Sequence, residues 1–382
     1  MPAAVQEKDG GKKAPVVLRP FKVGAQTVDD EPWERTVTTT ASAQPLDQYN
    51  VPSSAFLEEI EIHVIGTTSG NAATVAFKED APWNVIDVLN FLDTGNSDVI
   101  TQITGWDLMI INKMGGYKFA DDPQASPLYS ATTGAGGTGG SFGFLLRVPI
   151  ELVPRDALGP LPNKSASTPF KLKITVAPTS SIYSTAPTTP PSVLFRMTPV
   201  SYWEPTAQDG SGNAVAPQPP AMNTTQFWNK TPYVANSGPW VQQLDNAIGF
   251  PIRNLIFVLR GSDGLRSTGE ANFPDPFKLQ MQSNIVANRR KANWSDRIAK
   301  AYGYDGIGDG KNQKNNGVYV LPYNHDFAQK PGWENRRQYL RTSDGMRLEA
   351  KGTIGGSGSQ SMHIFANYVS PAAGVSLAQI TT

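Results

Sequence analysis

The stretch INKMGGY at residues 111–117 reads I-x-K-x-x-G-Y, and IAKAYGY at residues 298–304 repeats that pattern. The two copies lie 187 positions apart (298 − 111), which is about half of the 382-residue chain. Solenoid repeats recur every ~20–50 residues, so a match at half-length indicates two copies of one fold unit instead. The chain also exceeds the roughly 250–300 residues at which single cores divide into domains. The motif therefore predicts two related domains.

Segments on both sides of the motif match in the same order. Each motif ends a helical pattern led by a tryptophan, at Trp106 in the first copy and Trp294 in the second. Apolar residues follow each tryptophan at intervals of four, which places them on one helix face. A strand precedes each helix, and a strand with an internal proline follows it. These matching strands are 56–66 with 250–261, and 145–150 with 318–323.

The rest of the chain has the pattern of short strands. Residues 170–176 (FKLKITV) alternate between apolar and polar side chains, as a strand with one buried face does. Glycine (35) and proline (31) together make about 17% of the chain, which suits strands separated by turns. Alternation alone fits an immunoglobulin-like sandwich as well, but a helix and long loops inside each unit favour a jelly roll. We predict an all-β fold: two tandem eight-stranded jelly-roll β-sandwiches, each with a short helix, plus an N-terminal arm.

The predicted domain order follows from these segments. It consists of an N-terminal arm at 1–44, a first jelly roll at 45–205, a linker or loop at 206–245, a second jelly roll at 246–370 and a C-terminal tail at 371–382. Two interpretations of the polar, proline-interrupted arm stay open: a disordered terminus, or a segment that orders against neighbouring subunits. Within the linker, the run PQPP is typical of an extended connection.

Composition excludes several classes of protein. Lys+Arg and Asp+Glu both total 33, so the formal net charge is zero, whereas nucleic-acid-binding domains are usually markedly basic. Cysteine is absent and histidine occurs three times, which argues against disulfide scaffolds, thiolate nucleophiles and the His-rich metal sites of cupin enzymes. No apolar run is long enough to span a membrane, and the N-terminus lacks the apolar segment of a signal peptide. Only 17% of residues are charged, which favours association.

Five charged segments could carry chemistry, and each has a plainer interpretation. The carboxylates at 58–61 and 79–80 could form a glycosidase pair, but strand alternation places the first group on an ordinary solvated face. Residues 305–310 (DGIGDG) resemble a calcium loop in composition but lack the EF-hand spacing. The basic runs at 288–291 and 335–341 are expected to form salt bridges at subunit contacts in preference to nucleic-acid contacts.

Four segments resemble one family of proteins: FKEDAPWNV at 77–85, GWDL at 105–108, KMGGY at 113–117 and RVPIE at 147–151. They look like the major capsid proteins of tailless, membrane-containing bacteriophages. These are the tectivirus-like members of the double jelly-roll lineage that is shared with adenovirus hexon. The resemblance covers roughly residues 45–370 and includes the length, the chain order and the internal duplication. Its motifs are structural and contain no catalytic signature.

The resemblance implies a structural protein that is not an enzyme and needs no cofactor. Three copies would form a homotrimer with a pseudo-hexagonal footprint, and these trimers would tile an icosahedral shell around an internal membrane and a double-stranded DNA genome. The implied partners are neighbouring capsid trimers, penton and minor capsid proteins and the internal viral membrane, without sequence-specific nucleic-acid binding. The implied location is the virion, after assembly in the host cytoplasm.

The repeated motif is expected to act in helix termination and assembly. Gly116 and Gly303 are expected to end the two helices, because glycine readily adopts the left-handed conformation that follows a helix. The residues assigned to this helix and assembly motif are Trp106, Lys113, Gly116, Tyr117, Trp294, Lys300, Gly303 and Tyr304.

Location relative to the family implies two further roles. The terminal arms would contact the inner surface or the membrane, and the cations expected to meet anionic lipid are Lys8, Lys12, Lys13, Arg19 and Lys22. The loops at 120–141, 205–245 and 305–317 would form the outer towers and the clasp between subunits.

A second hypothesis is a carbohydrate- or receptor-binding β-sandwich, such as a spike or lectin-like protein. Such a protein needs exposed aromatic residues around an acidic or calcium site, and no cluster in the sequence has that spacing. A stable trimer in solution favours the capsid hypothesis, whereas a calcium-dependent monomer that binds sugar favours the alternative.

Overall fold

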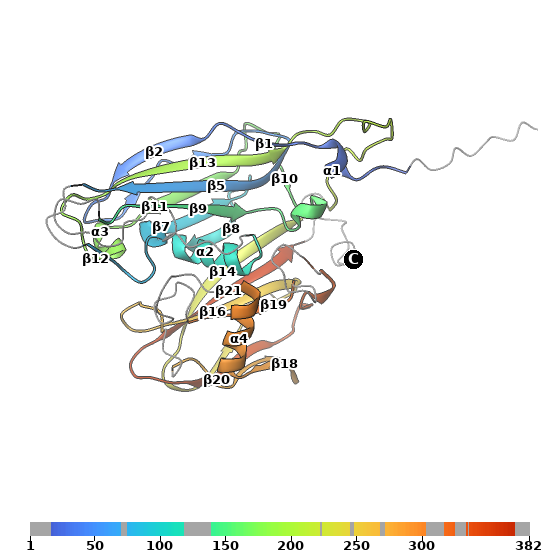
Figure 1. Ribbon diagram of the computed structural model, residues 1–382. Helices are drawn as coiled ribbons and strands as arrows, with labels where there is room; N and C mark the ends of the chain where they lie inside the picture. The colour runs from blue at the N-terminus through green and yellow to red at the C-terminus, as the bar shows by residue number, and fades with distance from the viewer. Residues whose placement is uncertain are drawn as a thin grey trace, which may run out of the picture.

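The computed structural model describes residues 17–69, 75–117, 139–221, 224–244, 248–267, 272–302, 317–324, 334 and 336–370. Two β-sandwiches lie one above the other, with the first half of the chain in the upper one (Figure 1). The prediction of an all-β fold built from two sandwiches is confirmed.

The first sandwich has two facing sheets. The sheet on the side away from the second sandwich, here called the β5 sheet, has the order β2 (Trp33–Thr38), β13 (Ser192–Tyr202), β5 (Phe56–Thr67) and β9 (Phe142–Pro149). Two short strands extend it, β1 (Thr27–Asp29) beside β13 and β10 (Leu161–Pro162) beside β5. The facing sheet has the order β3 (Gln44–Pro45) with β4 (Tyr49–Asn50), β11 (Lys171–Val176), β7 (Ile86–Leu92) and β8 (Asp98–Ile103).

The second sandwich repeats this plan. The sheet nearer the first sandwich, here called the β16 sheet, has the order β14 (Thr225–Val234), β21 (Ser361–Ser370), β16 (Ile252–Arg260) and β19 (Val318–Pro322). Its facing sheet has the order β15 (Gly238–Gln243), β20 (Leu348–Ile354), β17 (Phe277–Met281) and β18 (Asn284–Arg289).

The order of strands confirms the duplication and the jelly-roll topology. When the eight principal strands of each sandwich are numbered along the chain, with β3 and β4 counted as one, both have one sheet of order 1-8-3-6 and one of order 2-7-4-5. This is the wrapped double Greek key of a jelly roll. A helix joins the fifth strand to the sixth in each copy, α2 (Gly105–Met114) and α4 (Lys291–Tyr302). The half-length sequence repeat therefore corresponds to a repeat of the whole topology.

Short elements complete the described chain. They are the helices α1 (Phe21–Gly24), α3 (Thr179–Ile182), η1 (Trp83–Val85), η3 (Pro154–Asp156) and η4 (Arg336–Gln338), and the paired strands β6 (Ala76–Phe77) and β12 (Tyr183–Thr185). Within the described ranges, no helix is both long and apolar enough to cross a membrane.

One sheet runs through both sandwiches. The free edge of β14 pairs in parallel with β8, through Trp228 with Ile100 and Asn229 with Thr101. This contact joins the β16 sheet to the inner sheet of the first sandwich, and the combined sheet has nine strands. Hydrogen bonding across a sheet edge is a stiffer connection than a flexible linker, because neighbouring strands constrain one another. The two sandwiches therefore form one unit through their strands as well as their side chains.

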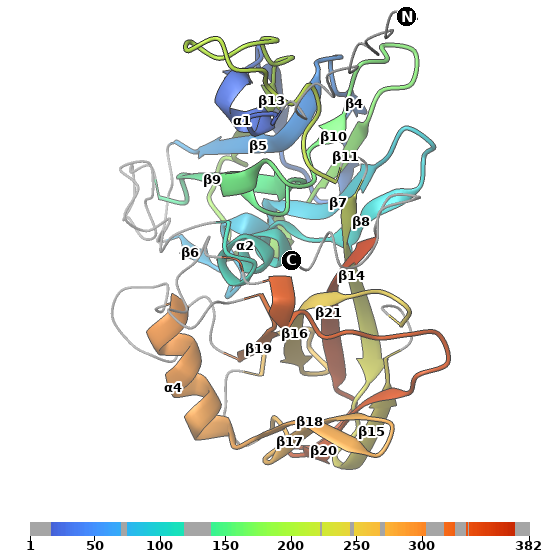
Figure 2. The ribbon, with the colours of Figure 1, turned by 90° about the vertical axis from the view of Figure 1, so that its right-hand side faces the viewer.

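Burial distinguishes the two copies of one strand. Side chains along β5 alternate between buried and half-buried, as expected for a sheet with one face in the core. The equivalent strand β16 is buried at eight of its nine positions. Strand β16 therefore has two covered faces, one packed in its own sandwich and one packed against the first sandwich (Figure 2).

Two predicted boundaries need correction. The predicted linker at 206–245 contains β14 and β15, because alternating partly buried side chains and pairing with β21 and β20 make this proline-bearing segment a pair of strands. The described part of the predicted arm, residues 17–44, contains α1, β1 and β2, because the long strand β13 offers them a pairing edge. The predicted jelly-roll bounds of 45–205 and 246–370 are therefore too narrow at their starts, because β2 belongs to the first sandwich and β14 and β15 belong to the second. The tail at 371–382 lies outside the described residues and stays a prediction.

Candidate functional site

The first copy of the repeated motif includes Trp106, Lys113, Gly116 and Tyr117. Most of these residues lie at the junction between the two sandwiches. Helix α2 lies at its centre, and capping defines both ends of this helix. At its start, Thr104 Oγ1 accepts a hydrogen bond from the Asp107 N–H (3.1 Å) and Asp107 Oδ2 accepts one from the Thr104 N–H (2.8 Å), which is a capping box. At its end, Gly116 has φ +81° and the Tyr117 N–H donates to the Asn112 carbonyl (3.0 Å). This is the Schellman arrangement, and the prediction that Gly116 ends the helix is confirmed.

All ten residues of α2 are buried. The spacing from Trp106 to Met114 predicts one buried face, towards the core of the first sandwich. The other face is buried as well, because the β16 sheet of the second sandwich packs against it. Polar residues such as Asp107 and Lys113 are therefore only 1% and 2% exposed.

An ion pair joins the start of α2 to the second sandwich. Lys230 on β14 places Nζ 2.5 Å from Asp107 Oδ2. The side chain of Asp107 is 1% exposed and that of Lys230 is 13% exposed, so water screens this pair much less than a surface pair. Asp107 thus serves both the local cap and the contact between sandwiches.

Trp106 packs against two arginines of the second sandwich. The guanidinium carbons of Arg260 and Arg266 are 5.0 Å and 4.8 Å from the centroid of its ring, within cation–π range. The same arginines donate hydrogen bonds to Asp80 of the first sandwich. Arg260 Nη1 lies 2.8 Å from Oδ2, and Arg266 Nε lies 2.7 Å from Oδ1. Glu79 Oε1 lies 3.3 Å from Arg266. The tryptophan and the two acidic residues of the first sandwich therefore bind it to the second sandwich.

Arg253 on β16 binds the other end of α2. Its Nη2 donates to the Gly115 carbonyl (2.8 Å), and its guanidinium lies 5.0 Å from the centroid of the Tyr117 ring. It also makes a two-pronged pair with Glu334, with N–O distances of 2.7 Å and 2.8 Å. The Tyr117 hydroxyl donates to Gln226 Oε1 on β14 (2.8 Å). Arg253 is 2% exposed, so this network is internal to the chain.

The charges at the junction alter the titration of their neighbours. Burial alone would raise the pKa of Asp80, but the guanidinium groups of Arg266 and Arg260 outweigh it and lower that pKa below the usual range. Burial raises the pKa of Glu79 in spite of Arg266. Burial, followed by the positive charges of Lys230 and Arg260, lowers the pKa of His363 to about 4. The acidic residues at 79–80 are thus partners in ion pairs across the junction.

The second copy of the motif has different surroundings. Trp294 is buried among aromatic rings and donates from Nε1 to the Val320 carbonyl (2.6 Å). Lys300 is exposed, although the matching Lys113 is buried. The Tyr302 hydroxyl donates to the Met114 carbonyl (3.3 Å), which brings the C-terminal end of α4 to that of α2. Gly303 and Tyr304 lie outside the described residues. The role of either copy in assembly stays a prediction.

The sequence analysis did not identify the residues of the second sandwich that form the junction around α2. They are Gln226, Lys230, Arg253, Arg260, Arg266 and Glu334, of which Gln226 binds Tyr117 and Glu334 binds Arg253. A signal existed for two of them, because Arg253 and Arg260 lie in a strand whose other residues, except Asn254, are apolar. A charged residue in such a strand calls for a buried partner.

The predicted inner-surface cations have mixed surroundings. Lys22 donates from Nζ to the Pro154 carbonyl and to the Tyr202 hydroxyl (3.1 Å), so its ammonium group already has partners within the chain. Arg19 is 57% exposed, with Nε 3.7 Å from Asp209. Lys8, Lys12 and Lys13 lie outside the described residues.

Near Lys22, two carboxyl groups share a buried site. The Tyr202 hydroxyl donates to Glu151 Oε2 (3.2 Å), and Glu58 lies beside Glu151. Burial, followed by the Glu58 carboxyl, raises the pKa of Glu151 to about 9. Two carboxylates in such a site cannot both ionise without a large cost.

The stability of the chain is therefore expected to fall as the pH rises from about 5 to about 9. In this window the unfolded chain has released the proton of Glu151, whereas the folded chain still binds it. The stabilisation present below the ordinary value of 4.5 is thus lost as the pH rises through the folded pKa. Urea denaturation at a series of pH values should show this decline in the wild type and a flatter profile in Glu151→Gln. Equal slopes in both proteins would contradict the assignment.

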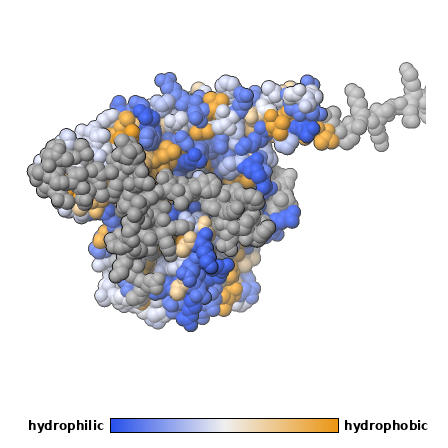
Figure 3. Space-filling view, in the orientation of Figure 1, coloured by the Kyte–Doolittle hydropathy of each residue, from blue (hydrophilic) through white to orange (hydrophobic). Residues whose placement is uncertain are grey.

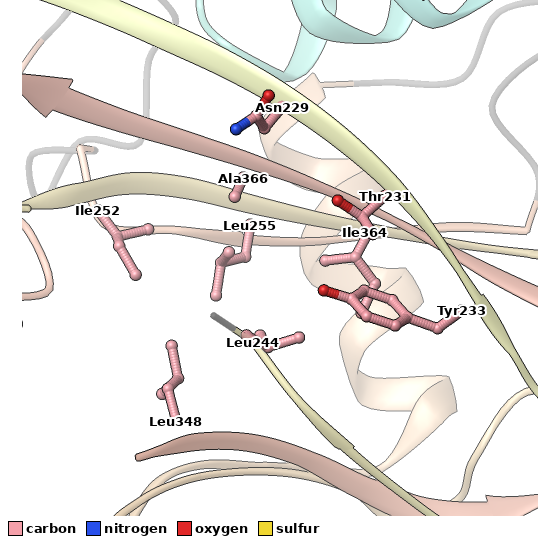
Figure 4. A pocket seen from close by; sticks show the side chains of 9 residues that line it. All are labelled: Asn229, Thr231, Tyr233, Leu244, Ile252, Leu255, Leu348, Ile364 and Ala366. Carbon is pink, nitrogen blue, oxygen red and sulfur yellow. The ribbon is translucent and has the colours of Figure 1, made fainter. Parts of the chain in front are cut away.

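A small gap lies between the two sheets of the second sandwich. Figure 4 shows side chains of β14, β16, β20 and β21 converging on it, with Leu255 and Leu348 from opposite sheets. It has room for about one water molecule, whereas ligand sites occupy roughly 300–1,000 Å³. Within the described part of the chain, no three acidic or histidine side chains gather as a metal site would require.

No family model matches the chain, and no curated protein matches it. Solved structures do match. The major capsid protein of Sulfolobus turreted icosahedral virus has a TM-score of 0.56 and 13% identity, over 89% of this chain and 97% of that chain. That of bacteriophage PM2 has a TM-score of 0.51 and 10% identity, over 92% of this chain and 100% of that chain. The PBCV-1 capsid has a TM-score of 0.54 and 11% identity, over 93% and 95%. The chain therefore has the double jelly-roll fold of viral major capsid proteins.

Proposed function

We propose that this chain is a structural major capsid protein. The proposal rests on the junction inside the chain. Two sandwiches of the same fold meet there head to tail, and each contributes a different side to the contact. Contacts of this heterologous type build closed rings from repeated units when the rotation between units closes. The likeness in fold to viral major capsid proteins, over 89% or more of the chain, supports the same role.

In this role the subunit forms a homotrimer. Three chains supply six sandwiches, which gives a threefold particle a pseudo-hexagonal outline that can tile the flat facets of an icosahedral shell. The trimers contact neighbouring trimers and penton and minor capsid proteins, and the shell encloses an internal membrane and a double-stranded DNA genome. The protein is assembled in the host cytoplasm, functions in the virion and has no enzymatic role.

One end of the first sandwich suits contact with the internal membrane. Val17, Leu18, Val23 and Trp203 are 84%, 52%, 58% and 56% exposed near α1. Figure 3 shows apolar residues gathered where the described chain begins. The exposed guanidinium of Arg19 adds a positive charge that anionic lipid headgroups attract. This end is therefore the inner end of the subunit in the proposed shell.

The proposal is tested by the mass of the purified protein in solution. Size-exclusion chromatography with light scattering should give about three times the chain mass of 41.2 kDa at micromolar concentration. A monomer at every concentration, together with calcium-dependent binding to sugar, would favour a carbohydrate-binding sandwich and contradict the proposal.

A further inference from the structure

Of the histidines that the structure describes, His363 lies on the junction face of the β16 sheet. Its backbone on β21 pairs with Pro232 on β14 on one side and with Val258 on β16 on the other. The next residue along β21, Ile364, lines the gap inside the second sandwich. Because successive side chains of a strand point to opposite faces, the ring of His363 points away from that gap and towards the first sandwich.

Two cations flank the ring of His363 on the same face of the sheet. Lys230 comes two residues before Pro232 on β14, and Arg260 comes two residues after Val258 on β16. Both are therefore diagonal cross-strand neighbours of His363. Such neighbours in antiparallel strands lie about 7–8 Å apart, which is within reach of long side chains.

The charges around His363 balance while its ring is neutral. Asp107 and Asp80 of the first sandwich are the acidic groups that act on the ring across the junction. Each acidic group at this end of the junction already has a cation as its partner. These ion pairs are Asp107 with Lys230, Asp80 with Arg260 and Arg266, and Glu79 with Arg266. A proton on the ring would therefore add an uncompensated positive charge.

The hydrogen bonds of the ring also suit its neutral form. Nε2 of His363 lies 3.1 Å from Ser361 Oγ, whereas Nδ1 is buried and has no hydrogen-bond partner among the described residues. A neutral imidazole has one N–H group, which Ser361 Oγ can accept from Nε2. The protonated ring has two N–H groups, and the one at Nδ1 would be a buried donor without an acceptor, which is unfavourable.

We propose that His363 is an acid-sensitive switch, and that a proton on its ring loosens the junction between the two sandwiches. Protonation places three positive charges, those of Lys230, Arg260 and His363, next to one another on one face of the β16 sheet. The switch lies within one chain, so it does not depend on the proposed capsid function. In the proposed shell, an acidic environment would loosen every subunit in the same way.

The direction of the pH dependence follows from the surroundings of the ring. Burial, followed by the charges of Lys230 and Arg260, lowers the pKa of His363 from 6.5 to about 4. Between these two values the ring is protonated when it is released from the junction and neutral when it is held there. The stabilisation of the closed junction that is present above 6.5 is thus lost as the pH falls towards 4.

Hydrogen exchange of the full-length chain at a series of pH values tests the switch. The amides of β8 and β14 report on the junction, because these strands pair across it. As the pH falls from about 7 to about 4.5, their exchange, corrected for the intrinsic effect of pH, should rise at least about tenfold in the wild type. His363→Gln keeps a polar side chain beside Ser361 but cannot gain the charge, so the rise should be absent. An equal rise in His363→Gln, or no rise in the wild type, would overturn the proposal.

The matched control is the other described histidine. His63 lies on the outer face of the β5 sheet, away from the junction, and burial lowers its pKa as well. His63→Gln should therefore exchange its β8 and β14 amides as the wild type does. A loss of the acid response in His63→Gln would show that the effect does not arise at the junction.

A second measurement needs only the wild type, in case His363→Gln fails to fold. Nuclear magnetic resonance of the ring-labelled protein follows the titration of its three histidines. At least one ring should stay neutral until the pH falls to about 4, whereas three titrations near 6.5 would contradict the switch. The mass of the assembly tests the capsid function separately, so failure of the switch leaves that function in place.

Discussion

Replacing Arg253 by methionine is expected to lower the free energy of unfolding by about 3–5 kcal/mol. Arg253 and Glu334 have side chains that are 2% and 4% exposed, so the substitution leaves a carboxylate buried without its cation. The same change removes the hydrogen bond to the Gly115 carbonyl at the end of α2. Urea denaturation at one fixed protein concentration measures the loss.

Two further variants distinguish the effect of losing a buried ion pair from the effect of losing an exposed one. Arg253→Met combined with Glu334→Gln should recover a large part of the loss, because no uncompensated charge remains. Arg155→Ala removes an ion pair with Asp156 whose arginine is 72% exposed, and it should cost no more than about 1 kcal/mol. A loss in Arg253→Met as small as that in Arg155→Ala would show that the junction does not depend on this network.

Replacing Trp106 by alanine is expected to cost about 3–5 kcal/mol, the range for a fully buried tryptophan. Its ring is fully buried against Arg260 and Arg266, so its removal opens a cavity and leaves both guanidinium groups without their aromatic partner. Because the cavity lies between the sandwiches, unfolding in urea should also separate into two transitions. Fluorescence and circular dichroism followed together detect such a separation.

The control for Trp106 is another tryptophan. Trp203 is 56% exposed, and Trp203→Ala should change the free energy of unfolding by no more than about 0.5 kcal/mol. A single transition in Trp106→Ala with a loss close to that of Trp203→Ala would contradict the central place given to this residue.

Local patterns in the sequence predicted the elements that depend on local physics. Alternation identified β5 and β11, tryptophan-led spacing identified α2 and α4, and glycine at position 116 identified the end of α2. Each of these features depends on residues within a few positions of one another. The duplication was also predictable, because both copies keep the same order of such features.

Features that depend on distant pairing could not be predicted in the same way. Strand β14 has polar residues and Pro232 in its sequence and resembles a linker, yet β21 on one side and β8 on the other make it a central strand. The ion pairs between Lys230 and Asp107, and between Arg260 and Asp80, join residues more than 100 positions apart. No local period carries information about such contacts.

The spacing of Trp106, Ile110 and Met114 accounts for only one face of α2. Leu108, Met109 and Ile111 lie off that face, and all ten residues of the helix are buried. A helix that is apolar all round is expected to be buried on every side, so this part of the sequence did carry a signal. What the sequence did not show is which part of the chain covers the second face.

The most direct test of this account is cryo-electron microscopy of the isolated protein. The account predicts a threefold-symmetric ring with six sandwich-sized lobes, two from each chain. A monomer, or an assembly without threefold symmetry, would contradict it.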